Sequence, residues 1–208
     1  MSVGPQAIRQ ETYGENGASF VDRLRTWMVG QSIRRAAAGR DSIVALDLGC
    51  GYRAGYLRAL NGQLTRGVGV DFRVSDDTKK VPGLEFIEES IEAALPKIAA
   101  NQFDLVLFIS VLEHVADPET ALHHCHRVLR QGGRLLVNVP TWWAKPVLEF
   151  SAFTLGTSPA IEMEDHKLYY DKRTLWPMLV KAGFRPSRIR MSYQKLGMTL
   201  FSTSEKAV

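Results

Sequence analysis

The chain has 208 residues, of which 45% are hydrophobic and 23% are charged, and its formal net charge at pH 7 is +4. This length predicts one domain with a sizeable core, and these proportions exclude disordered and fibrous classes of protein. The mild basic excess suits a phosphorylated small substrate, and it is too dispersed along the chain to predict a nucleic-acid partner.

Two features bear on the compartment of the protein. The cysteines, Cys50 and Cys125, form neither a disulfide framework nor a metal-binding spacing, which fits a reduced compartment. The N-terminus lacks the apolar core of a signal peptide, and the longest apolar stretch, Trp142–Leu155, is too short to span a bilayer. We therefore expect a cytoplasmic protein without a transmembrane segment. A peripheral membrane contact through the aromatic side chains of this stretch is an alternative that the sequence leaves open. The oligomeric state is left open.

Helical and strand patterns alternate along most of the chain. Residues 1–17, rich in glycine and polar residues, are expected to be flexible, and a helix is expected from Ser19 to about Gly39. The expected strands are Ile43–Leu48, Gly67–Asp71, Leu84–Ile87, Phe103–Ile109, Arg134–Val139, Ser187–Tyr193 and Met198–Thr203. The expected helices between them are Ala54–Leu60, Ser90–Ile98, a helix capped by Asp117 and stopped by Gln131-Gly132-Gly133, and Lys172–Ala182. This alternation predicts a single α/β domain, residues 1–208, with a mainly parallel sheet covered by helices on both faces.

The most informative segment is VALDLGCGYRAGYLRAL, at Val44–Leu60. An apolar run that predicts a buried strand leads into a glycine-rich turn, and a helical pattern follows. Glycine permits positive φ and a close approach to a ligand, and we expect the first amides of the helix to be free for an anionic group. Gly49, Gly51 and Ala54 satisfy the pattern G-x-G-x-x-G/A, and Asp71 ends the next strand where a ribose-binding acid is expected. The segment predicts a nucleotide-cofactor site.

Asp47, two residues before the first glycine, discriminates between cofactors. A carboxylate beside the turn would repel the pyrophosphate of NAD, whereas the ammonium group of S-adenosylmethionine would be attracted to it. The residues therefore favour S-adenosylmethionine, with an NAD-dependent oxidoreductase as the alternative.

Three segments together resemble the class I S-adenosylmethionine-dependent methyltransferases, in their small-molecule branch. They are DLGCG at Asp47–Gly51, GVGVD at Gly67–Asp71 and FDLVLFISVLEHVADP at Phe103–Pro118. The resemblance implies a Rossmann-like sheet of seven strands, the last antiparallel, and S-adenosylmethionine as the cofactor. The cofactor-binding residues that it implies are Asp47, Gly49, Cys50 and Gly51 at the methionine end, Asp71 at the ribose, Phe72, Glu89, Ser90 and Ile91 around the adenine, and Ser110, Val111 and His114 between the methionine end and the acceptor.

Two positions depart from the family pattern. Arg53 stands where the family often has a third glycine, and Ser90 stands where an acid commonly meets the adenine amino group. Glu89 is the candidate substitute for that acid.

The downstream third of the chain bears on the acceptor. NVPTWWAKPVLEFSAF and EDHKLYYDKRTLWPMLVKAGF resemble methyltransferases of cell-surface polysaccharide and sugar biosynthesis. We therefore expect a small-molecule acceptor, a sugar or a glycan-biosynthesis intermediate. The alternatives are a quinone or other lipid-like acceptor and a non-catalytic module that only binds the cofactor.

Two histidines are candidate general bases. His114 is expected at a strand end in the predicted crevice, where holding the loop or the cofactor is the competing role. His166 lies in residues 140–170, the longest irregular insertion, which we expect to cover the substrate. The substrate-side candidates are Trp142, Trp143, Tyr169 and Tyr170, with ordinary packing as the alternative for each. The acidic residues near His166 and the cluster His123–His126 are more simply explained as solvated surface, so no metal is predicted.

Overall fold

The computed structural model describes residues 20–40, 42–60, 62–143 and 168–208. Its strands are β1 (Ile43–Leu48), β2 (Leu64–Asp71), β3 (Leu84–Glu88), β4 (Phe103–Ile109), β5 (Leu129–Pro140), β6 (Ile189–Gln194) and β7 (Thr199–Glu205). Its α-helices are α2 (Phe20–Ala37), α3 (Gly55–Ala59), α4 (Asp76–Lys79), α5 (Ile91–Ala94), α6 (Pro118–Val128) and α9 (Lys172–Lys181). Short 3₁₀ turns cover η1 (Leu95–Lys97), η2 (Leu112–His114), η3 (Pro186–Arg188) and η4 (Lys195–Gly197).

The seven strands form one sheet in the order β3-β2-β1-β4-β5-β7-β6. The ladders from β3 to β5 are parallel, and β7 runs antiparallel to both of its neighbours. The expected α/β architecture, a Rossmann-like and mostly parallel sheet whose last strand is antiparallel, is therefore confirmed. The order reverses at β1, because β2 lies on one side of β1 and β4 lies on the other, and ligands of open α/β sheets bind at such a switch point.

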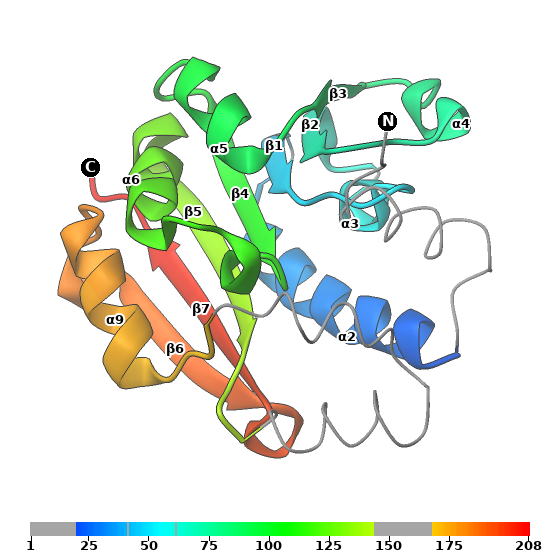
Figure 1. Ribbon diagram of the computed structural model, residues 1–208. Helices are drawn as coiled ribbons and strands as arrows, with labels where there is room; N and C mark the ends of the chain where they lie inside the picture. The colour runs from blue at the N-terminus through cyan, green and yellow to red at the C-terminus, as the bar shows by residue number, and fades with distance from the viewer. Residues whose placement is uncertain (1–19, 41, 61, 144–167) are drawn as a thin grey trace, which may run out of the picture.

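Helices cover both faces of the sheet (Figure 1). One apolar layer joins α5, α6 and α9 to the sheet and includes Leu122, Leu175 and Phe184, all at most 1% exposed. The other layer joins α2 and α3 to the opposite face and includes Ile33 and Leu57, both fully buried. Because both faces are covered, the central strands are apolar along almost their whole length, which is the pattern from which the parallel sheet was predicted.

Local signals explain most element boundaries. Asp117 caps α6 by accepting a hydrogen bond from the amide of Thr120 at 3.0 Å, as expected. The helix expected over Ser90–Ile98 is instead the short α5 followed by η1, since Pro96 cannot donate to a continuing α-helical ladder. The sequence patterns did not predict α4, whose N-cap is Ser75.

The boundary between α6 and β5 differs from the expectation. The helix ends at Val128, and the glycine pair that was expected to stop it lies inside β5. The pairing of β5 with β4 jumps from Phe103–Leu129 to Leu105–Arg134, so the chain bulges out of the ladder at these glycines. Gly132 has φ +72°, which glycine adopts without strain. The two glycines therefore form a bulge in the strand and do not end the helix.

Among the described residues, no helix is both long enough and apolar enough to cross a lipid bilayer.

Candidate functional site

The turn after β1 folds back onto the end of β2. The amides of Gly49 and Cys50 donate to the carbonyl of Val70 at 2.8 and 3.2 Å, and the amide of Gly51 donates to Oδ2 of Asp71 at 2.7 Å. These three amides of the turn are therefore engaged within the chain, because β1 and β2 end side by side and the turn satisfies its donors on β2, whereas the expectation that the first amides of the helix are free for an anionic group stays a prediction.

The two glycines serve different purposes. A Cβ on Gly49 would overlap a methyl group of Val111, so this glycine lets the loop after β4 pack on the turn. Gly51 has φ +72°, and a Cβ placed there would meet no atom within 4 Å. The backbone at Gly51 thus borders open space, which leaves room for a ligand to approach it closely.

The departure at Arg53 has a local explanation. Arg53 is exposed, and the strained residue of the turn is the next one, Ala54, with φ 46° and ψ 50°. This left-handed conformation disfavours side chains with a Cβ, and alanine is the smallest of them. Ala54 is fully buried against α3, so the third position of the G-x-G-x-x-G/A pattern is a packing position.

Two carboxyl groups lie at the ends of β1 and β2. Asp47 is 1% exposed, and neither of its carboxyl oxygens has a hydrogen-bond partner in the part of the chain that the structure describes. Burial, and after it the negative charge of Asp71, raises the pKa of Asp47 to about 8. Asp71 is 8% exposed and accepts hydrogen bonds at 2.7 Å from the amides of Gly51 and Phe72. This pair of carboxyl groups would favour a cationic ligand.

The residues expected around the adenine lie near Asp71 in the sheet but are engaged within the chain. Phe72 follows Asp71 and is 46% exposed, so its ring is available to a ligand. Ser90 is the N-cap of α5 and accepts from the amide of Ala93 at 3.2 Å, while Ile91 is buried. Glu89 forms an ion pair with Lys97 at 2.5 Å. The role of Glu89 as a partner of the adenine stays a prediction, and it requires this ion pair to open.

The loop after β4 brings the LEHV segment, Leu112–Val115, to the glycine turn after β1. Ser110 has φ 55°, and its amide donates to the carbonyl of Asn138 in β5 at 2.7 Å. The chain turns at Ser110, so Val111 packs over Gly49. The turn η2 follows and carries the partly exposed His114. The structure therefore brings Asp47, Gly49 and Val111 together, and the role of His114 stays a prediction.

Tyr170 is a core residue. It is 2% exposed, its hydroxyl donates to the carbonyl of Leu112 at 3.4 Å, and its amide donates to the carbonyl of Pro140 at 3.1 Å. Burial, and after it the charge of Glu113, raises the pKa of Tyr170 above its ordinary value. Of the two roles considered for Tyr170, the structure supports packing, and the contact helps to hold η2 in place.

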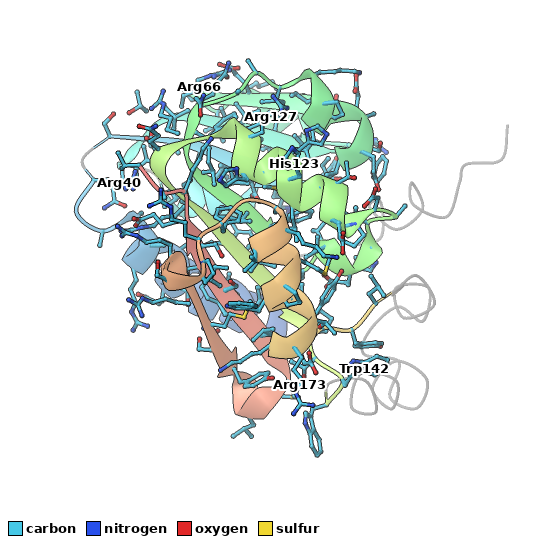
Figure 2. All side chains as sticks on the ribbon, turned by 90° about the vertical axis from the view of Figure 1, so that its left-hand side faces the viewer. Arg40, Arg66, His123, Arg127, Trp142 and Arg173 are labelled. Atoms are coloured by element: carbon cyan, nitrogen blue, oxygen red, sulfur yellow. The ribbon has the colours of Figure 1, made fainter. Side chains whose placement is uncertain are left out.

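The other aromatic candidates lie beyond the end of β5. Trp142 is 56% exposed and Trp143 is 80% exposed. The ring of Trp142 packs on that of Tyr169, with centroids 5.3 Å apart and planes tilted by 37° (Figure 2 labels Trp142). Tyr169 is 9% exposed, so Trp142 presents the larger surface to an acceptor. His166 and its acidic neighbours lie outside the described residues.

Two further observations concern a hollow that the sequence did not predict and the His123–His126 cluster that was interpreted as solvated surface. A hollow of about 390 Å³ lies beside the glycine turn, and its lining residues are Tyr52, Arg53, Arg58, Ser75, Asp77, Thr78 and Val81. Its only signal in the sequence is the capping pattern that starts at Ser75. In the described part of the chain, no three His, Cys, Asp or Glu side chains gather as metal ligands would, and His123 is exposed on α6 (Figure 2).

The fold is shared with solved structures. One of them, an S-adenosylmethionine-dependent methyltransferase from Archaeoglobus fulgidus, superposes with a TM-score of 0.63 at 16% identity, over 90% of this chain and 98% of that one. At this identity the likeness shows the fold.

Sequence comparison gives a family match over a little less than half of the chain. Residues 46–137, which include both carboxyl groups and the LEHV segment, match the family model described as a methyltransferase domain. This match, together with the shared fold, supports a class I S-adenosylmethionine-dependent methyltransferase domain in this chain, with S-adenosylmethionine as its cofactor.

Two curated relatives match a similar part of the chain. An uncharacterised 37.1 kDa protein of transposon Tn4556 from Streptomyces fradiae is 33% identical over 136 residues, or 60% of this chain and 39% of the relative. A ubiquinone biosynthesis O-methyltransferase from Alkalilimnicola ehrlichii is 31% identical over 115 residues, or 50% of this chain and 44% of the relative. The chain therefore spans less than half the length of either relative.

Proposed function

We propose that this chain transfers a methyl group from S-adenosylmethionine to a small-molecule acceptor. The observation that carries the proposal is the carboxyl group of Asp47, buried beside a second carboxyl group and without a hydrogen-bond partner among the described residues. A buried polar group without a partner costs several kcal/mol. The ammonium group at the methionine end of the cofactor would provide both a donor and a countercharge at this point.

The rest of the turn fits S-adenosylmethionine better than NAD. A pyrophosphate needs free amides or cationic side chains, but the amides of Gly49 and Gly51 donate within the chain, and the two carboxyl groups of Asp47 and Asp71 lie beside the turn. A ribose diol, in contrast, would suit the carboxylate of Asp71, and the open side of Gly51 leaves space for the cofactor beside it. The exposed ring of Phe72 is then in place to cover the adenine.

When bound, the cofactor supplies an electrophilic methyl group on a sulfonium sulfur. The chain's own residues hold the two ends of the cofactor, align the acceptor and keep water out. His114 is the described residue that we assign to the acceptor side, where an imidazole can take a proton from a hydroxyl near neutral pH. We assign the same side to His166, and a turnover that is intact in His166→Ala would remove that assignment.

For the acceptor we favour a planar, lipid-like molecule such as a quinol precursor over the sugar that the sequence led us to expect. The exposed indoles of Trp142 and Trp143 offer a flat apolar surface at the end of β5. One curated relative is named a ubiquinone biosynthesis O-methyltransferase.

Calorimetry and a label-transfer assay test the proposal. We expect the protein to bind S-adenosylhomocysteine with micromolar affinity and NAD not at all, and the reverse result would support an oxidoreductase. With S-adenosylmethionine labelled in its methyl group, we expect label to enter hydroxylated aromatic compounds but not nucleotide sugars. Cofactor binding without transfer to any compound of either panel would instead indicate a module that only binds the cofactor.

A further inference from the structure

A pocket lined by arginines lies between α2 and the strands β5, β7 and β6, which are separated by β4 from the strand that carries the glycine turn. Its volume is about 310 Å³. The residues that line this arginine pocket are Ser32, Arg35, Ala36, Arg134, Arg190, Phe201 and Thr203. They come from α2, β5, β6 and β7, which are far apart in the sequence.

The register of the sheet brings these residues together. Arg134 pairs with Glu205 across β5 and β7, and Arg190 pairs with Thr203 across β6 and β7. Arg35 reaches the same place from the last turn of α2. Arg190 and Asp47 lie in one row of paired residues across the sheet, four strands apart, so the arginine pocket is separated from the cofactor residues across the strands, by about 20 Å at Arg190. Figure 2 shows Arg40, just beyond α2, at the opposite side of the molecule from Trp142.

One arginine of the pocket is held in place. The Nη1 group of Arg134 donates to the carbonyl of Ala36 at 2.7 Å, and its Nε donates to Oε2 of Glu205 at 3.2 Å. The same carboxylate also accepts from Arg188 at 2.9 Å. Glu205 is therefore shared between two guanidinium groups and compensates the charge of only one of them.

The other two arginines have no such compensation. Arg35 and Arg190 are exposed, and among the described residues no carboxylate lies within ion-pair distance of either. The hydroxyl groups of Ser32 and Thr203 add hydrogen-bond donors, and Phe201, 7% exposed, forms an apolar floor. The arginine pocket thus combines an excess of positive charge with an apolar floor.

We propose that the arginine pocket binds the phosphate group of a small molecule, at a site separate from the cofactor turn. Guanidinium groups match phosphate oxygens in pairs of parallel hydrogen bonds, and Arg35 and Arg190 are the exposed guanidinium groups that would make them, while Arg134 adds positive charge beside them. The volume suits a phosphate or pyrophosphate group with a small organic part. A nucleic acid would instead call for an extended basic stripe, which this concave pocket does not resemble.

Calorimetry at constant ionic strength tests the proposal, with inorganic pyrophosphate, glucose 6-phosphate and sulfate as probes. We expect at least one of the two phosphate probes to bind clearly more tightly than sulfate. A comparison of pyrophosphate with glucose 6-phosphate shows whether an inorganic or an organic phosphate is the better ligand. Arg190→Gln and Arg35→Gln should each weaken that binding at least fivefold, and Arg190→Lys should have an intermediate effect because it keeps the charge and loses the paired hydrogen bonds. The matched control is Arg173→Gln, at an exposed arginine on α9 outside the pocket, which should change the affinity less than twofold.

Three results would overturn the proposal. The first is phosphate probes that bind no better than sulfate, and the second is an equal loss of affinity in Arg173→Gln, which would indicate general attraction to the basic surface. The third is a short oligonucleotide that binds more tightly than either phosphate probe and depends on Arg190. Saturation with S-adenosylhomocysteine should leave phosphate binding unchanged, because β1 and β6 are four strands apart in the sheet. Unchanged melting temperatures of the variants would show that each is folded.

Discussion

Replacing Asp47 by asparagine is the sharpest test of the electrostatics of the turn. The substitution keeps the size and polarity of the side chain and removes its titration. Burial and the charge of Asp71 raise the pKa of Asp47 from 3.8 to about 8 in the folded protein, whereas the unfolded chain has the ordinary value. At a pH between these two pKa values, Asp47 is protonated in the folded state and ionised in the unfolded state. The stability of the protein must therefore fall as the pH rises through this window.

The size of the effect follows from the width of the window. Each pH unit inside it changes the contribution of Asp47 to the free energy of unfolding by about 1.4 kcal/mol. From pH 5 to pH 7 the loss is about 2 to 3 kcal/mol. Asp47→Asn should therefore stabilise the ligand-free protein at both pH values, by about 2 kcal/mol at pH 5 and by about 4 kcal/mol at pH 7, and should be close to neutral only near pH 4.

Urea unfolding at pH 5, 6, 7 and 8 measures this difference. The matched control is Asp117→Asn, since the hydrogen bonds from Thr120 lower the pKa of that exposed carboxyl group, so its replacement gives no stabilisation that grows with pH. The reasoning is refuted if wild-type protein and Asp47→Asn show parallel curves of stability against pH. A second readout is the release of protons when S-adenosylhomocysteine binds at pH 7, detected by calorimetry in buffers of different ionisation enthalpy. Asp47→Asn should abolish that release, and wild-type affinity should rise from pH 6 to pH 8.

Three further predictions concern the turn and its surroundings. Asp71→Ala should weaken S-adenosylhomocysteine binding at least tenfold in calorimetry because the ribose contact is lost, and unchanged affinity would contradict the placement of the ribose. Gly49→Ala should lower the free energy of unfolding by about 2 to 3 kcal/mol, since its Cβ would overlap Val111 at a positive φ, whereas Gly51→Ala should cost only about 1 kcal/mol yet weaken cofactor binding. Equal stability losses in urea unfolding of these two variants would contradict the difference in packing. Tyr170→Phe should cost about 1 kcal/mol, measured in the same way, because the hydrogen bond to η2 is lost, and a gain in stability would contradict that contact.

The sheet was predictable because each central strand carries its own signal. The run Phe103–Ile109 is apolar at nearly every position, and the structure has β4 over those same residues. Burial on both faces is what removes polar residues from a parallel strand, so the pattern and the architecture have one cause. The end of α6 was not predictable in the same way, because Gly132 and Gly133 are equally suited to stopping a helix and to forming a bulge, and the pairing partner in β4 decides between them.

The same distinction applies to the candidate functional site, which the sequence predicted in part. The residue types and spacing of Asp47, Gly49, Gly51 and Asp71 by themselves predicted a site for a nucleotide-like cofactor at the end of β1, and the acid before the turn favoured S-adenosylmethionine over NAD. Only the tertiary structure decided where the hydrogen-bond donors of the turn go. They are satisfied by Val70 and Asp71, so the two carboxyl groups and the open side of Gly51, rather than free amides, define the site. The arginine pocket, assembled from four elements by sheet register, has no local signal at all, since its residues become neighbours only when the chain folds.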